Sequence, residues 1–234
     1  KEETAAAGSN DDSEGTLVVD KNIHNTPHQY DVVEDDAAIK KLVAELKKHS
    51  EICFDTETTG IDANDAELVR LSFSVKPGTA YYVPCPADQK RTKEILAHFE
   101  PLFSDKKKTW IGQNTKYDLL VLKWYDVEVA GPLFDTMLAH YVIEPDGKRS
   151  MDILSERFLG YEPVHIEELI GKKGPRGSKA QGSMRDVELE KIKEYAGEDA
   201  DITLQLKQVF EPMLKQKEVE KVFNEVENPL VKVL

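Results

Sequence analysis

A short apolar run that ends in two acidic residues constrains the fold of this chain more than any other feature. Ile52, Cys53 and Phe54 include a β-branched and an aromatic side chain, which favours a buried strand. Asp55 and Glu57 follow at i and i+2, so both side chains point to one face, about 6.6 Å apart along the strand. Two such carboxylates repel each other unless a cation, for example a hard divalent ion, lies between them. The alternative is a solvated acidic strand end, and this pair alone does not decide between the two.

The elements around this run predict an α/β fold. Residues 68–75 and 80–83 alternate as strands joined at Pro77-Gly78, which extends the first strand into an antiparallel meander. Residues 109–112 and 132–134 are strands that lead directly into helices, so we expect both to run parallel to the first strand. The prediction is a mixed five-stranded sheet with helices on both faces; Tyr30–Val33 could add a short edge strand.

Apolar spacing and capping residues predict the helices. They are expected at residues 37–49, 90–103, 113–124, 136–142, 151–158, 187–215 and 219–234. Asp35 or Asp36 caps the first of these helices and Asp186 caps the long one, which Pro212 interrupts or kinks.

Composition fits one compact domain with a tail or two, since 40% of the 234 residues are hydrophobic and 32% are charged. The net charge of −13 argues against a nucleic-acid partner, but its distribution weakens that objection. Residues 1–36 hold ten acidic residues against two lysines, a net of −8, which leaves −5 for the remainder. Residues 1–27 are polar and acidic, and we expect a flexible linker there.

Two cysteines without C-x-x-C spacing argue against a disulfide framework and a zinc site, and for a reducing, cytoplasmic location. No apolar run approaches the ~20 residues of a membrane span, so no membrane partner is expected. Lys1 is not a start methionine, which indicates a fragment of something longer. The basic, Gly-rich residues 171–179 lack the P-loop pattern, and either a mobile loop near a polyanion or a solvated loop accounts for them.

Further acidic residues fall where the fold would bring them to the first pair. Asp118 lies on the first turn of the helix that leaves strand 109–112, beside the first strand, so its side chain can reach the same edge. Tyr195 and Asp199 are i and i+4 on one face of the long helix, while Glu198 and Asp201 point elsewhere. The order of the strands is expected to bring these elements together.

Here the sequence resembles a known family. The segments F-D-T-E-T-T-G, G-Q-N-T-K-Y-D-L-L-V-L and Y-A-G-E-D-A-D-I-T-L-Q-L look like the three exonuclease motifs of the DEDD superfamily, tyrosine subtype. They are most similar to the 3′-5′ proofreading domains of bacterial DNA polymerase I, and F-D-T-M-L-A and M-D-I-L-S-E-R-F-L extend the likeness. The resemblance implies a ribonuclease H-like fold, an exonuclease domain at 28–216 and, at 217–234, the start of the connection to a polymerase domain.

The resemblance also implies an active nuclease, because all four acidic positions are occupied. Phosphodiester hydrolysis by two divalent ions, Mg²⁺ or Mn²⁺, would use the four carboxylates as ligands. Asp55 would bridge both ions, Glu57 and Asp199 would complete the site that activates water, and Asp118 would hold the second ion largely through its waters. Tyr195 would orient the attacking water.

The implied partner is a single-stranded or frayed DNA 3′ end, held by stacking and backbone contacts. Ile61 matches an apolar residue wedged against the terminal base, and Asn114 and Tyr117 match contacts to the terminal nucleotides. Thr56 completes the implied DNA-binding set. Tyr117 could instead pack under the edge of the sheet.

Two other functions remain open from the sequence. One is a stand-alone ribonuclease D-like exonuclease that trims RNA, which the C-terminal likeness to a polymerase entry helix disfavours. The other is a non-catalytic exonuclease-fold scaffold or DNA clamp, against which the intact carboxylates argue.

Overall fold

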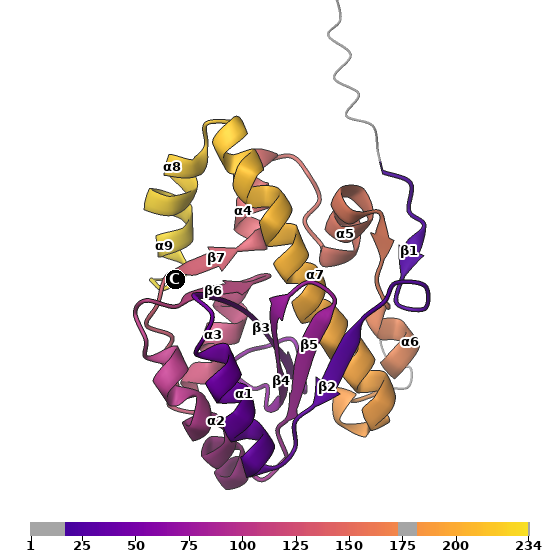
Figure 1. Cartoon of the computed structure of the whole chain (residues 1–234), viewed down its shortest axis with the longest axis vertical. Coiled ribbons are helices and arrows are strands. Elements are labelled where there is room, and N and C mark those ends of the chain that lie inside the picture. The colour runs from indigo at the N-terminus through magenta and orange to yellow at the C-terminus, as the bar shows by residue number, and fades with distance from the viewer. Residues whose placement is uncertain (1–16, 173–181, 234) are drawn as a thin grey trace, which may run out of the picture.

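Six strands form the central sheet in the computed structural model, which describes residues 17–172 and 182–233 (Figure 1). Their order is β2-β5-β4-β3-β6-β7. The bounds are β2 (Gln29–Val32), β3 (Glu51–Thr58), β4 (Leu68–Lys76), β5 (Thr79–Pro84), β6 (Thr109–Gly112) and β7 (Leu133–Asp135). β3, β4 and β5 form the antiparallel meander, and β6 and β7 continue the sheet parallel to β3, as predicted. The sixth strand is β2, the edge strand that residues 30–33 suggested, and it runs parallel to β5.

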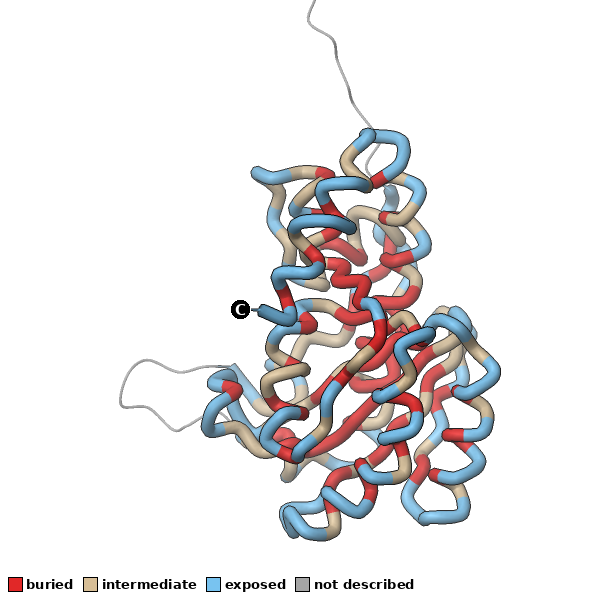
Figure 2. The backbone as a smooth tube through the Cα atoms, turned by 90° about the vertical axis from the view of Figure 1, so that its left-hand side faces the viewer, coloured by how far each residue is buried: buried red, intermediate tan, exposed pale blue. Residues whose placement is uncertain are grey.

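Helices cover both faces of this sheet. They are α1 (Asp36–Leu46), α2 (Gln89–Phe103), α3 (Thr115–Lys123), α4 (Thr136–Ile143), α5 (Met151–Leu159), α6 (Ile166–Ile170), α7 (Leu189–Gln216), α8 (Glu220–Val222) and α9 (Asn228–Leu230). α7 crosses one face diagonally and contacts the strands from β2 to β6 (Figure 1). Buried residues line the interior between the layers (Figure 2). None of the helices in the described part of the chain is long and apolar enough to span a membrane.

Alternation along β3 explains which residues face α7. Phe54 packs into the core under α1 and α2, in an edge-to-face contact with Trp110 at 5.5 Å. Cys53 packs into the opposite core, which α4, α5 and α7 line. Because successive strand residues alternate between faces, Asp55 and Glu57 share the face of Cys53 and point toward α7.

The expected linker differs from the structure over its last part. Lys21–Asn22 form a short strand, β1, which pairs in parallel with β8 (Tyr161–Glu162), and Ile23 is buried. A two-residue strand is too short to show any alternation, so composition alone misassigned it. Residues 1–16, and residues 173–179 of the basic segment, lie outside the described residues.

The start of the long helix and the effect of its proline also differ from expectation. Asp186 lies in a 3₁₀ turn (Met184–Asp186), and Glu188 occupies the N-cap position of α7. Pro212 does not interrupt the helix, which continues to Gln216. A proline removes one backbone hydrogen bond, and the tertiary contacts of a long buried helix can offset that loss. The first cap is confirmed, because the Asp35 side chain accepts a hydrogen bond from the backbone N–H of Ala38.

The C-terminal segment packs onto the same core as the domain before it. A π-helical turn (Phe223–Glu227) joins α8 to α9. Phe223 is only 1% exposed, and its ring lies 4.9 Å from the ring of Phe134 on β7. The side-chain amide of Asn228 donates to the carbonyl of Leu133. The packed unit therefore extends beyond residue 216, the boundary that the sequence suggested.

Candidate active site

The first part of the site lies at the end of β3, where this strand pairs with β4. Asp55 stands opposite Ser72 and Glu57 stands opposite Arg70 on the antiparallel neighbour β4. The register shifts between Glu57 and Thr58, so β3 leaves regular pairing directly after the second acid. Glu57 is thus the last residue of the regular ladder, and β3 ends one residue later at Thr58.

α7 brings the second part of the site across the sheet. Tyr195 and Asp199 lie one helical turn apart on the face that packs against β3 and β4. Gly197, on another face, lets the helix approach β2, because a Cβ atom at this position would lie 2.5 Å from Cγ of Tyr30. Ala196 and Ala200 are fully buried and add no bulk to the contact. Small residues in this stretch therefore set how close the acid of α7 comes to the acids of β3.

Three of the four predicted carboxylates come together. Ligand atoms of Asp55, Glu57 and Asp199 all lie within 4.8 Å of one another. Oδ2 of Asp55 and Oδ1 of Asp199 are buried without a hydrogen-bond partner. Burial, followed by the nearby carboxylate charges, raises the pKa of both aspartates well above the usual range. Unpartnered buried oxygens at this spacing fit a hard divalent cation, which takes oxygen ligands.

Asp118 stands beside this group but does not belong to it. Its side chain is only 3% exposed, and its Oδ1 accepts hydrogen bonds from the backbone N–H of Thr56, at 3.1 Å, and from the Thr56 hydroxyl. Burial raises the pKa of Asp118 to about 8, while the Thr56 hydrogen bonds oppose the rise. The charge of Asp118 in turn raises the pKa of Asp55, after the larger effect of burial, so the two groups are close.

The predicted DNA-contact residues differ in their exposure. Ile61 is 88% exposed, and Asn114 is exposed and adopts the left-handed conformation with φ 61°. The Tyr117 hydroxyl is hydrogen-bonded to Gly60 and Thr58, which ties α3 to the turn that precedes Ile61. Tyr117 is half-buried, so packing at the sheet edge and a nucleotide contact both remain compatible with its position.

Thr56 is used within the protein. Its side chain is buried and its hydroxyl is directed at Asp118 rather than at solvent. A DNA contact by Thr56 stays a prediction.

Asp135 is a site residue that sequence reasoning passed over. It ends β7, and its carboxylate accepts hydrogen bonds from the backbone N–H groups of Asn114 and Thr115 and from those of Met137 and Leu138 in α4. One buried carboxylate thus holds the beginnings of α3 and α4 together. The F-D-T-M-L-A segment contained the signal, but the bond to α3 becomes visible only once β6 and β7 are neighbours.

Arg70 is the second residue that sequence reasoning passed over. Its side chain is 0% exposed, and its Nη2 lies 3.1 Å from Oε1 of Glu57. Its guanidinium carbon lies 5.6 Å from the ring centre of Tyr195 and 5.8 Å from that of Tyr82. The signal was an arginine between Val69 and Leu71 in a strand that is buried over most of its length. The structure therefore puts a buried cation next to the carboxylate group.

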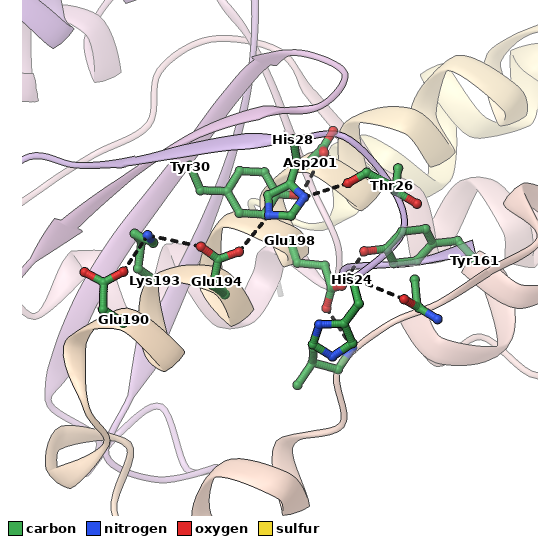
Figure 3. Close-up of polar contacts among 12 residues, drawn as sticks. His24, Thr26, His28, Tyr30, Tyr161, Glu190, Lys193, Glu194, Glu198 and Asp201 are labelled. Atoms are coloured by element: carbon green, nitrogen blue, oxygen red, sulfur yellow. Dashed lines mark hydrogen bonds and ion pairs between the residues drawn. The ribbon is translucent and has the colours of Figure 1, made fainter. Parts of the chain in front are cut away.

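The other acids of α7 point away from the site, as predicted. Glu198 accepts a hydrogen bond from the Tyr161 hydroxyl at 2.5 Å, and Asp201 accepts one from the Tyr30 hydroxyl at 2.9 Å (Figure 3). Nearby, His28 contacts Glu194 at 2.7 Å. The two tyrosine contacts, from β2 and β8, fix the rotation of α7, and so they determine which of its acids faces β3.

Comparison with known proteins agrees with the geometry. The sequence profile of a 3′-5′ exonuclease family matches residues 30–215. DNA polymerase I of Pseudomonas aeruginosa is 38% identical over 215 residues, which is 88% of this chain and 23% of that protein. DNA polymerase I of Borreliella burgdorferi is 36% identical over 82% of this chain and 21% of its own length. The chain thus spans less than a quarter of these relatives.

Solved structures show the same fold at low sequence identity. Brucella melitensis NrnC bound to pGG has a TM-score of 0.67 and 19% identity, over 89% of this chain and 91% of that one. Trypanosoma brucei RNase D has a TM-score of 0.64 and 16% identity, over 82% and 72%. These structures are ribonuclease H-like exonucleases, which agrees with the predicted fold class. From its profile match and its polymerase relatives, the chain belongs to the 3′-5′ exonuclease family, in the form found in DNA polymerase I.

Proposed function

We propose that this chain removes nucleotides from single-stranded or frayed DNA 3′ ends by two-metal-ion phosphodiester hydrolysis, as the proofreading domain of a DNA polymerase I. The observation that carries the proposal is the group of three carboxylates, with its two unpartnered buried oxygens. Its members come from β3 and α7, two elements far apart in the sequence that the fold packs together, which distinguishes the group from a run of acidic residues on the surface.

The residues divide the chemistry among themselves. Asp55, Glu57 and Asp199 would hold divalent ions directly, and Asp118 would contribute to a second ion from its position beside them. When bound, such ions supply a nucleophile from water and relieve negative charge on the reacting phosphate. Tyr195, one helical turn before Asp199, would hold the attacking water in line through its hydroxyl.

Metal binding has support beyond the carboxylates themselves. Brucella melitensis NrnC, which shares the fold with a TM-score of 0.65, has been solved with bound Mg²⁺. Mg²⁺ keeps several waters and is usually held by one or two carboxylates together with substrate phosphates. A group of three carboxylates with a fourth beside it suits that mode of binding.

The DNA end would approach over the turn that carries Ile61. This exposed apolar side chain follows the end of β3 and would pack against the face of a terminal base, whatever the base is. Asn114 and Tyr117, at the beginning of α3, would contact the terminal nucleotides. The polymerase relatives support DNA as the substrate.

A ribonuclease D-like activity on RNA is the second candidate, and T. brucei RNase D shares the fold. The sequence identity to DNA polymerase I is higher, so DNA is favoured. We further propose that residues 217–234 lead toward a polymerase domain in the full-length protein, since the relatives are more than four times as long as the region they share with this chain.

The test is hydrolysis of labelled nucleic acids by the purified chain. We expect Mg²⁺- or Mn²⁺-dependent removal of nucleotides from a single-stranded DNA 3′ end, faster on a mismatched primer end than on a paired one, and no activity with a chelator. Faster cleavage of single-stranded RNA would favour the ribonuclease D alternative. A protein that binds DNA but does not hydrolyse it in either Mg²⁺ or Mn²⁺ would favour the non-catalytic scaffold.

A further inference from the structure

We infer that Arg70 is a built-in counter-ion of the carboxylate group, which stabilises the group without metal and lowers its affinity for divalent cations. The inference rests on the proposed metal site, and it concerns how tightly that site holds an ion before DNA arrives. It assigns to Arg70 a positioning and charge-balancing role, not a catalytic one.

Arg70 lies in the interior of the sheet beside the carboxylate group. It belongs to β4 and stands directly across from Glu57 on β3. Its side chain is completely buried, and among the described residues Glu57 is its only ion-pair partner. A buried cation is strongly unfavourable without a partner, so the carboxylate group stabilises the charge of Arg70, and Arg70 in turn stabilises the charge of the carboxylates.

The aromatic neighbours carry the second step. The guanidinium group stands over the rings of Tyr195 and Tyr82, at 5.6 and 5.8 Å from the guanidinium carbon to the ring centres. Both distances are within the range of a cation–π contact. These contacts and the backbone pairing of β4 keep the positive charge at the site whether or not a metal ion is bound.

The charge balance carries the third step. A divalent ion binds the deprotonated carboxylates, whose combined formal charge is −3, and Arg70 reduces the net charge of the site to −2. The attraction of a divalent cation to its ligands grows with their net negative charge, most strongly where water is excluded. Glu57, which Arg70 contacts, is itself one of the three ligand groups. Arg70 therefore competes with an incoming ion for the same carboxylate.

The experiment compares Mn²⁺ binding by calorimetry, and thermal unfolding in EDTA and in Mn²⁺, for five forms of the 234-residue chain. The forms are wild type, Arg70→Met, Arg70→Gln, Arg70→Lys and Lys207→Met. Lys207 is the matched control, since it is a buried cation of α7 that pairs with Glu51 and Glu211 rather than with the carboxylate group. Arg70→Gln serves as a second neutral variant.

We expect Arg70→Met to bind Mn²⁺ at least ~10-fold more tightly than wild type, a change equivalent to about 1.4 kcal/mol. In EDTA it melts at a lower temperature, and Mn²⁺ raises that temperature by more than in wild type. Arg70→Lys keeps the charge and stays close to wild type. Lys207→Met is less stable but binds Mn²⁺ as wild type does. A neutral variant that folds only with Mn²⁺ would also support the inference.

Unchanged or weaker Mn²⁺ binding by the neutral variants would overturn the inference, because positioning of Glu57 would then outweigh the charge. Tighter binding by Arg70→Lys would overturn it as well, since the charge would not be the cause. Failure of the wild-type chain to bind Mn²⁺ would overturn the proposed metal site, and this inference with it.

Discussion

Replacement of Gly197 by alanine tests how closely α7 must approach the sheet. The new Cβ atom would lie 2.5 Å from Cγ and 2.6 Å from Cδ2 of Tyr30. Tyr30 cannot easily move, because its ring is buried and its hydroxyl donates to Asp201 at 2.9 Å. Either α7 or β2 must therefore shift to admit the methyl group.

Two opposing effects determine the magnitude. Overpacking of this kind costs about 1–3 kcal/mol. Alanine in a helix interior is favoured over glycine by about 1 kcal/mol, which offsets part of that loss. We therefore expect Gly197→Ala to lower the free energy of unfolding by about 1 kcal/mol, and hydrolysis to fall because Asp199 lies only two residues further along α7.

The assay is urea unfolding of a double-mutant cycle. Tyr30→Ala removes the ring and destabilises the chain by itself, by about 3 kcal/mol or more. In that background the clash is gone, so Gly197→Ala should raise stability by about 1 kcal/mol through helix propensity. An unchanged or higher urea midpoint for the single Gly197→Ala variant would refute the close-approach argument.

Three further predictions follow from the site and its surroundings. Asp55→Asn should slow hydrolysis by ~10³-fold or more, and it should raise stability in EDTA because it removes one of three crowded carboxylates. Tyr195→Phe should lower the rate of hydrolysis by less than Asp55→Asn does, because orienting water contributes less than holding a metal. Asp135→Asn should lower the free energy of unfolding by about 1–3 kcal/mol, since the amide turns a donor toward backbone N–H groups. His140→Leu should remove a loss of stability at acid pH, measured by urea unfolding from pH 7.5 to 5.

The sign of the His140 prediction follows from its surroundings. His140 is fully buried beside Phe158 and Phe210, and burial lowers its pKa below the usual 6.5, with the charges of Arg157 and Arg149 acting in the same direction. Glu144 opposes the shift. As the pH falls, the unfolded chain therefore takes up a proton on this histidine before the folded chain does. The contribution of His140 to the free energy of unfolding is full above pH 6.5 and falls below it. Equal acid sensitivity of wild type and variant would contradict this assignment.

Other outcomes would contradict the predictions for Asp55, Tyr195 and Asp135. Near-normal hydrolysis by Asp55→Asn would remove the basis for the metal site. Equal losses in Asp55→Asn and Tyr195→Phe would show that the two residues do not divide the work as proposed. For Asp135→Asn, wild-type stability would mean that the hydrogen bonds to α3 and α4 are dispensable.

Local sequence pattern was enough to predict five strands of the central sheet and the convergence of Asp55, Glu57 and Asp199. Asp55 and Glu57 share a face because of strand alternation, and the parallel pairing of β3 with β6 places the beginning of α3 at the same edge. The i, i+4 spacing identified Tyr195 and Asp199 as one helix face. These features depend on short segments and on strand order, both of which a sequence displays.

Features that depend on register between distant segments could not be predicted. Arg70 meets Glu57 only because β3 and β4 pair in one particular register. The hydrogen bond from the Thr56 hydroxyl to Asp118 forms only once α3 is packed, and no local pattern indicates it. The short strand β1 carries no periodic signal, and only its partner β8 defines it.

The contribution of α7 to the carboxylate group links catalysis to the order in which the chain is completed. β3 is made early and α7 late, and neither alone presents more than two of the three ligand groups. On the proposed mechanism, a nascent or partly opened chain whose long helix has not yet docked would lack one of the three carboxylates and would not hydrolyse DNA. Hydrolysis would then require the completed fold, and an ion bound by the group would in turn stabilise the docked position of α7.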